Sequence, residues 1–227
     1  MEDIGREYLA DLVSRIIERL PKSTTKLCNL QTLILVGCLK LVELPSYWSN
    51  LVNLRHLRLY VLNESSVSIP PRIGTLKGLQ TLRYFNVGKE IGRGINELKD
   101  LIHLRGCLRI SELENVVNVE EAKEAQLKNK QKIDELKLRW KCDDDMELRQ
   151  EGIEEEVLNA LQPHTNLKKL AIEGYRGVRF PTYPIGFDHV LGAVEQLLHL
   201  RGGQCKFILA HIPQVKMVDA MAVNEAI

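Results

Sequence analysis

The feature of the sequence that most constrains its fold is an irregular apolar beat in the stretch LCNLQTLILVGCLKLVELP, residues 27–45. Apolar residues recur there at gaps of three, three, two, three, three and three positions. An α-helix returns to the same face every 3.6 residues and a strand every two, so neither element produces this pattern throughout. Only Leu33 and Leu35 keep the strand period. The beat therefore predicts a short strand, after which the chain turns back and sends Cys38, Leu41 and Leu44 into the same interior.

The two-residue apolar step recurs along most of the chain. Its six copies are Leu33/Leu35, Leu57/Leu59, Phe85/Val87, Leu108/Ile110, Leu136/Leu138 and Leu170/Ile172. Successive copies start 24, 28, 23, 28 and 34 residues apart. These intervals lie in or just above the roughly 20 to 29 residues of a leucine-rich repeat, so the longer ones must hold insertions. One unit cannot bury its own leucines, whereas stacked units share a core in which each buried leucine contributes roughly 1.5–3 kcal/mol.

These observations predict an α/β fold, a leucine-rich repeat solenoid. We expect a curved parallel β-sheet on its concave face, and irregular arms and helices on its convex face. The expected division is an N-terminal helical cap over residues 1–20, about six repeats over residues 21–181, and a divergent tail over residues 182–227. Apolar residues keep helical spacing in the cap until Pro21 breaks the run. In the tail the beat is lost, and we expect a helix near residues 188–200 and a strand near 206–210.

The connections between the later strands carry signals for convex helices. Asn118, followed three residues later by Glu121, is typical of an N-cap with its capping-box partner and predicts a helix to about Lys130. A second helix is expected over residues 153–161. Eight acidic residues lie within residues 143–156, so the first part of that segment is expected to be a solvated loop.

Charge and cysteine content narrow the class of protein. Lys and Arg number 31 against 30 for Asp and Glu, so a net charge of +1 gives no argument for nucleic acid or an anionic membrane as the main partner. No stretch is long and apolar enough to span a bilayer, and the charged N-terminus is unlike a secretory signal. We expect reduced cysteines, mostly buried, in a cytosolic or nuclear protein. They are Cys28, Cys38, Cys107, Cys142 and Cys205.

Two segments could carry chemistry, and each has a simpler interpretation. The glycines of GKEIGRG, residues 88–94, lack both phosphate-loop spacings, so we expect a flexible turn between repeats. The acidic run at residues 143–145 lacks the alternating ligands and central glycine of an EF-hand. The histidines and cysteines do not pair at zinc-ligand spacing. We therefore predict no catalytic, cofactor-binding or metal-binding residues, while an enzyme with its site in the tail stays an alternative.

The outward strand positions form the candidate site. Neighbouring strands of a solenoid lie side by side, so these side chains share one surface, where Arg and Tyr are favoured interface anchors. The simpler alternative is a face that is polar because it meets water. The residues expected to contact a protein partner are Ile34, His56, Arg58, Tyr60, Tyr84, Asn86, Arg109, Lys137, Arg139 and Lys169. Other outward positions are Thr32, Val36, Ser111, Glu135, Ala171 and Glu173.

Several long runs resemble the repeats of plant intracellular nucleotide-binding, leucine-rich-repeat disease resistance proteins of the coiled-coil class. The resemblance covers roughly residues 21–181. The runs are LPKSTTKLCNLQTLILVGCLKLVELP, IPPRIGTLKGLQTL, FNVGKEIGRGINELKDLIHLRGCLRISELENV, EEAKEAQLKNKQKIDELKLRW and VLNALQPHTNLKKLAIEGYRGVRFP. Residues 1–15, MEDIGREYLADLVSR, resemble part of the winged-helix region of that family, which normally lies well upstream of the repeats. This proximity indicates a truncated family member.

The resemblance implies a role in plant defence without catalysis. In the family the repeats help to hold a nucleotide switch inactive and contribute to recognition of pathogen effectors, directly or through a guarded host protein. The expected partner is such an effector, a guarded host protein or a nucleotide-binding module. The full-length family binds ADP or ATP, but no residue here inherits that property, because the Walker A loop and the Met-His-Asp motif are missing. The alternatives are a generic leucine-rich repeat scaffold or adaptor unrelated to immunity, and a non-functional truncated remnant.

Overall fold

The computed structural model describes residues 19–36, 47–60, 69–141, 151–177, 179, 181 and 206–210. Within them, the strands are β1 (Thr32–Val36), β2 (His56–Tyr60), β3 (Thr81–Leu82), β4 (Tyr84–Asn86), β5 (Arg105–Ser111), β6 (Lys132–Arg139), β7 (Lys169–Glu173) and β8 (Lys206–Ala210). The α-helices are α1 (Val119–Glu124) and α2 (Glu151–Ala160). Short 3-10 helices span Lys22–Lys26, Trp48–Asn50, Ile73–Thr75, Ile95–Leu98, Leu113–Asn115 and Leu127–Asn129.

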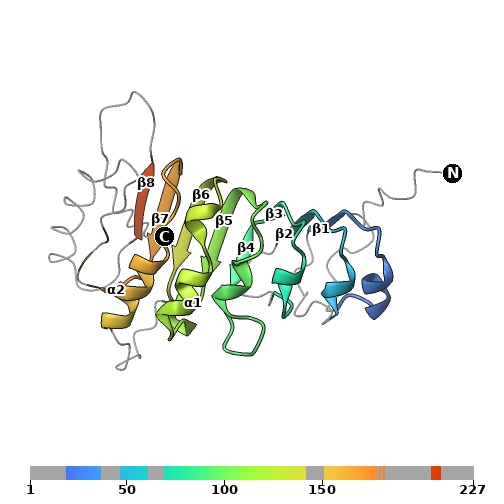
Figure 1. Cartoon of the computed structure of the whole chain (residues 1–227), viewed down its shortest axis with the longest axis horizontal. Coiled ribbons are helices and arrows are strands. Elements are labelled where there is room, and N and C mark those ends of the chain that lie inside the picture. Colours follow the sequence, from blue (N-terminus) through green and yellow to red (C-terminus); the bar gives the residue numbers. More distant parts are fainter. Residues whose placement is uncertain are drawn as a thin grey trace, which may run out of the picture.

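The strands form two sheets, and in each sheet neighbouring strands follow the order of the sequence. The first sheet has the order β1-β2-β3 and the second β4-β5-β6-β7-β8. All neighbours pair in parallel except β7 and β8, which are antiparallel. Figure 1 shows the strands side by side along the long axis, with α1 and α2 on one flank of the array. The predicted α/β class with parallel strands is confirmed, and each apolar step marks a strand or runs just past its end.

The inward side chains of adjacent strands stack in register and make the core. Leu33 pairs with Leu57 and Leu35 with Leu59 across the first sheet. These four leucines are 1 to 4% exposed. In the second sheet Leu136 and Leu138 lie opposite Leu170 and Ile172, again buried. Because the inward side chains of each strand pack against those of the next strand, the repeats share a single apolar interior.

Polar side chains form hydrogen bonds from several repeats to the repeat before. Asn53 Nδ2 donates to Cys28 O at 2.9 Å, and Asn115 Nδ2 donates to Val87 O at 2.7 Å. Glu97 works in the opposite sense, since its carboxylate accepts from the backbone N–H of Gly74 at 2.9 Å in the preceding repeat. These bonds satisfy backbone groups that the irregular arms would otherwise leave without partners.

Two polar residues occupy positions on the three-residue beat that leucine holds elsewhere. Lys130 is 0% exposed, and its Nζ donates to Leu98 O at 2.6 Å and to Leu101 O at 3.4 Å. Burial lowers the pKa of Lys130 to about 8, opposed by a smaller upward effect of Asp100. His164 is also buried, with Nε2 at 2.8 Å from Ile133 O. Each side chain thus replaces an apolar contact with a bond to the preceding repeat.

The helices in the connections differ in length from the sequence-based expectation. Asn118 is the predicted N-cap, with its Oδ1 accepting from Glu120 N at 3.0 Å. Helix α1 nevertheless ends at Glu124 and not near Lys130, because Gln126 takes a left-handed φ of 49°. Helix α2 is confirmed and begins two residues before the expected range. The turn expected over residues 88–94 is also confirmed, and Gly92 (φ +81°) accepts from the backbone N–H of Arg72 at 2.6 Å.

Within the described residues, two of the five cysteines lie outside the core and one outward position is buried. Cys28 is exposed in the turn before β1, and Cys107 is half-buried on the outward side of β5, so neither is a core side chain. Ala171 is buried although its position is outward, because a methyl group between neighbouring strands does not reach past them. The other three cysteines and the acidic run lie outside the described residues. So do residues 1–18 of the expected cap, whose last two residues are not helical.

The tail strand expected near residues 206–210 is confirmed. Strand β8 has these bounds and pairs along β7, with Lys169 opposite Ala210 and Glu173 opposite Lys206. The antiparallel direction breaks the repeat pattern at this edge of the sheet. The helix expected near residues 188–200 lies outside the described residues.

Candidate functional site: the open face of the sheets

The candidate site is the outward side of the strands, which we call the open face. It carries the predicted contact residues Ile34, His56, Arg58, Tyr84, Asn86, Arg109, Lys137, Arg139 and Lys169, whose side chains are half-buried or exposed. Tyr60 is described in its backbone alone, at the end of β2. The parallel register sets these positions beside one another, for example Ile34 opposite Arg58 and Tyr84 opposite Arg109. The predicted residues thus belong to one surface, within which they form separate groups.

On the later strands, the basic residues are already paired within the molecule. Lys137 Nζ lies 3.0 Å from Glu173 Oε2, with the two side chains only 20% and 14% exposed. Arg139 Nε lies 4.0 Å from the same oxygen. A carboxylate shared by two cations and partly shielded from water is well stabilised. Lys137 and Arg139 therefore have a structural role that the sequence did not indicate.

A second group surrounds Asn86 at the end of β4. Ser111 Oγ donates to Asn86 Oδ1 at 3.1 Å, and Asn86 Nδ2 donates to Glu112 Oε1 at 3.3 Å. Burial raises the pKa of Glu112, while the hydrogen bond from Asn86 opposes that rise. Nearby, the ring of Tyr84 has the guanidinium carbon of Arg109 at 5.5 Å from its centroid, within cation–π range.

The two sheets are interrupted at Arg83, the residue between β3 and β4. Arg105 N donates to Gln80 O at 2.9 Å, and Arg109 N donates to Arg83 O at 2.8 Å. Between these two bonds the chain advances four positions in β5, from Arg105 to Arg109, but only three positions from Gln80 to Arg83. The register between β5 and β6 also shifts at Gly106, whose φ of +78° favours glycine. The ladder of backbone hydrogen bonds is irregular at this point, although bonds of ordinary length continue on either side of it.

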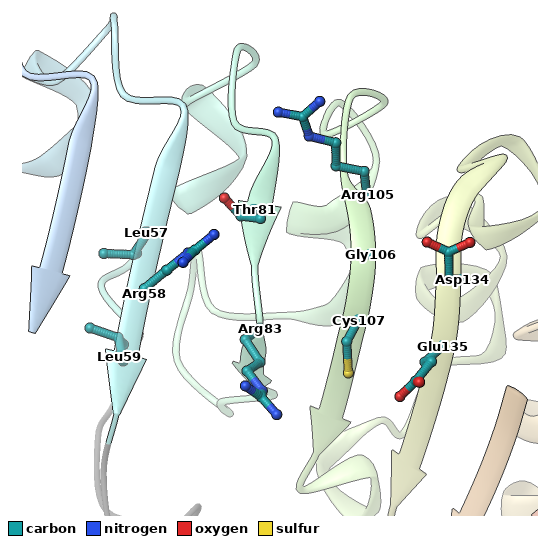
Figure 2. Close-up of a pocket in the computed structure, with 10 residues that line it drawn as sticks. All are labelled: Leu57, Arg58, Leu59, Thr81, Arg83, Arg105, Gly106, Cys107, Asp134 and Glu135. Carbon is teal, nitrogen blue, oxygen red and sulfur yellow. The ribbon is translucent and has the colours of Figure 1, made fainter. Parts of the chain in front are cut away.

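The break leaves a depression of about 500 Å³ on the open face. Figure 2 shows Arg58 reaching from β2 toward β3, Arg83 beside it, and Arg105 at one end. On the opposite wall, Asp134 and Glu135 come from β6. Arg58 and Arg83 on one side, together with Arg105 at one end, make up what we call the arginine wall. The carboxylates of Asp134 and Glu135 line the opposite side.

The charges of the two walls are not equally neutralised. Arg58, Arg83 and Arg105 are exposed, and none forms an ion pair with a described carboxylate. Across the depression Asp134 already pairs with Lys168 at 2.8 Å, whereas Glu135 is exposed without such a pair among the described residues. The arginine wall therefore has the greater capacity for an added partner.

The charges of two of these arginines, Arg58 and Arg105, also act on His56. Its Nδ1 lies 2.6 Å from Thr81 Oγ1 across the β2–β3 pair. Burial lowers the pKa of His56, and the charges of Arg105, Arg58 and Arg55 lower it further. The charges of three arginines thus act on one imidazole, and the same positive potential would favour an anion nearby.

Sequence reasoning missed Arg83, Arg105 and their place in the break. A signal was present, because the leucine gap before a strand is three residues in LRHL but four in LRGCL, the run from Leu104 to Leu108. That extra residue is the bulge around Gly106. The side chains that gather there could not be identified without knowing which strands the bulge separates.

The described residues contain neither a candidate metal site nor a helix suited to span a membrane. No group of three or more His, Cys, Asp and Glu side chains among them could hold a metal ion. None of the helices described is both long and apolar enough to cross a membrane.

Comparisons with known proteins match the chain to plant repeats. A candidate disease resistance protein of Arabidopsis thaliana is 42% identical over 188 residues, covering 76% of this chain and 12% of that protein. Candidate disease resistance protein RGA4 of Solanum bulbocastanum is 40% identical over 146 residues, covering 64% of this chain and 14% of that protein. Disease resistance protein RGA2 of the same species is 43% identical over 110 residues, covering 48% and 11%.

The chain thus spans only about an eighth of the length of these relatives. The family profile described as R13L1/DRL21 LRRs matches residues 95–222, which is more than half of the chain and extends beyond Pro181. The matched range includes β5, β6 and β7, the strands that form one wall of the depression and the paired surface beside it. The chain belongs to the R13L1/DRL21 family of leucine-rich repeats.

Proposed function

We propose that the chain is a non-catalytic protein-interaction module of a plant intracellular immune receptor and that its open face binds a protein partner. The observation that carries the proposal is the arginine wall at the break between the sheets. Arginine is a favoured residue in protein interfaces, and three exposed guanidinium groups without carboxylate partners suit an acidic surface. The names of the relatives, which are disease resistance proteins, support a place in plant defence.

The finer parts of the proposal concern architecture and role. We infer a curved solenoid whose concave side is the open face, with residues 1–20 as a helical cap, residues 21–181 as repeats and residues 182–227 as a tail. Its role would be to recognise pathogen effectors, directly or through a guarded host protein, and to hold a nucleotide-binding module inactive. It would act in the cytoplasm or nucleus and bind no nucleotide itself.

A pull-down with charge-reversed variants tests this function. The bait is the full chain, and the probes are a nucleotide-binding module of a plant intracellular receptor and a panel of effectors. The triple variant Arg58→Glu, Arg83→Glu and Arg105→Glu should reduce capture of a bound partner at least tenfold. Arg58, Arg83 and Arg105 make no ion pair with a described carboxylate, so the fold should survive, as circular dichroism can verify.

The matched control is Lys26→Glu, Lys89→Glu and Lys128→Glu, which makes the same change in charge at exposed positions away from the open face. This variant should capture the partner as well as the unmodified chain does. Equal capture by both triple variants would remove the arginine wall from the account. An equal loss of partner capture in both triple variants would show that net charge alone causes the effect.

A further inference from the structure

We propose that the depression at the break between the sheets binds an extended peptide segment that carries one acidic side chain and, four residues away, one basic side chain. The inference rests on the proposed function, because it concerns the same open face, and it names the class of partner segment. It follows from the sign of the charge on each wall, from the distance between the walls and from the form of the floor.

The arginine wall sets the place of the acidic side chain. Arg58 projects from β2 toward Thr81 of β3, and Arg83 stands at the break farther along the strands, so an acidic side chain between β2 and β3 has a guanidinium group on either side of it (Figure 2). Guanidinium groups bind carboxylates through paired N–H donors, and such charge-assisted bonds are stronger than neutral ones. His56 adjoins the same place, because its Nδ1 lies 2.6 Å from Thr81 Oγ1 and Thr81 lines the depression.

Glu135 sets the place of the basic side chain. It belongs to β6 on the opposite wall, is exposed, and makes no ion pair within the described residues. Its neighbour Asp134 is engaged by Lys168 and is less available. A ligand that carried only negative charge would meet Glu135 unfavourably, whereas a ligand with both signs satisfies both walls.

The distance between the walls selects an extended conformation. Neighbouring strands lie about 4.8 Å apart, so a site between β2 and β3 is roughly 12 Å from β6. In an extended chain, residues four apart are about 13 Å from one another and face the same side. In a helix, residues four apart are only about 6 Å from one another. An extended segment crossing the strands therefore places its two charges correctly with three residues between them.

The floor of the depression is suited to a segment without bulk at its centre. The backbone of Gly106 has no side chain to fill the space, and a Cβ built there meets nothing within 4 Å. Cys107 contributes a small thiol beside it. A volume of about 500 Å³ lies within the usual range for a ligand-sized site.

Fluorescence anisotropy with labelled peptides and the full chain tests the spacing. The first probe is a nine-residue Thr/Val-rich peptide with aspartate at its third position and lysine at its seventh. The second has the same composition with aspartate and lysine adjacent, and the third has asparagine and glutamine instead. The first should bind with a Kd about tenfold lower than either of the others. Equal Kd values for all three would overturn the proposal.

Charge-swapped variants assign each wall. Arg83→Glu should abolish the preference for the first probe, and Glu135→Lys should transfer the preference to a probe in which glutamate replaces the lysine. Arg139→Glu is a poor control because Arg139 has partners of its own, so Lys128→Glu serves instead and should leave the preference unchanged. Failure of the swap with Glu135→Lys would overturn the two-wall arrangement.

The proposal and the function on which it rests can fail separately. Loss of partner capture in the arginine triple variant together with equal peptide affinities would uphold the interaction face and overturn the motif. Unchanged capture together with the expected peptide preference would uphold the depression as a peptide site and overturn its role in capturing that partner.

Discussion

The open face differs between the two sheets in how its charges are used. On the five-stranded sheet, Lys137 and its neighbours are matched by Glu173 within the molecule. Around the break with the three-stranded sheet, Arg58, Arg83 and Arg105 extend from the surface without a described carboxylate partner. Side chains in ion pairs within the molecule stabilise the sheet, whereas exposed charged side chains without an ion pair can bind a partner. The same residue type thus has different roles in neighbouring repeats.

The largest expected effect concerns whether the two regions are independent in stability. Trp48, before β2, and Trp140, after β6, are both 0% exposed. Replacing either by alanine should cost about 3–5 kcal/mol through the cavity left behind. Because repeats contact mainly their neighbours, Trp48→Ala should weaken hydrogen-exchange protection chiefly in β1 and β2, and Trp140→Ala chiefly in β6 and β7.

Mass spectrometry of amide exchange in the full chain measures this difference. Val52→Ala, at a side chain that is 63% exposed, controls for handling and should change little. A uniform loss of protection across both sheets in both tryptophan variants would show a single cooperative unit and break the comparison.

The next effect concerns Lys130, the buried cation inside the second region. Its folded-state pKa of about 8 lies below the ordinary 10.5. Between these values the unfolded chain binds more protons than the folded chain, so stability rises with pH across that window by up to about 3 kcal/mol. Lys130→Met should lose this rise.

Urea unfolding at pH 7, 8, 9 and 10 measures the difference in unfolding free energy between Lys130→Met and the unmodified chain. The comparison cancels the titration of other lysines and of tyrosines, because both chains share them. Parallel pH curves for the two chains would show that Lys130 is not desolvated in the folded protein.

The sequence determined the strands well because their signal is local. Leu33 and Leu35 face inward for the same reason that Leu136 and Leu138 do, and alternation along a strand requires no knowledge of distant residues. The break at Arg83 is different. It depends on matching the lengths of three strands, and a single extra residue around Gly106 changes which side chains meet across the sheet.

The sequence also did not indicate which charged residues form ion pairs with one another. Lys137 and Glu173 are 36 positions apart and meet only through the register of β6 with β7. Lys130 could have been recognised, since it stands three residues from both Leu127 and Ile133 and so continues the apolar beat. What the beat does not supply is its partner, the carbonyl oxygen of Leu98 in the preceding repeat.

A third prediction compares Glu173, which forms an ion pair, with Arg83, which forms none with a described carboxylate. Glu173→Gln removes the charge that Lys137 and Arg139 share, and should cost about 1 kcal/mol of unfolding free energy. Arg83→Gln should stay within about 0.5 kcal/mol, because Arg83 is exposed and its guanidinium carbon lies 5.9 Å from the centroid of the Tyr84 ring, a surface contact that contributes little. Urea unfolding in low and high salt measures both.

Added salt should reduce the difference between the unmodified chain and Glu173→Gln, since ions screen the pair. It should leave the smaller effect of Arg83→Gln unchanged. Equal costs for the two variants would contradict the contrast between a paired and an unpaired region of the open face.

The smallest effect concerns His56, which lies within the unpaired region. Burial, then Arg105, Arg58 and Arg55, lower the pKa of His56 from its ordinary 6.5. Since the unfolded chain then binds more protons just below pH 6.5, stability falls as the pH drops through that window. Arg105→Gln should raise the pKa of His56 and lessen the fall, whereas Lys128→Gln, a remote loss of the same charge, should not. An NMR titration of the imidazole resonances measures both shifts, and an unchanged pKa of His56 in Arg105→Gln would mean that the charge of Arg105 does not act on this imidazole.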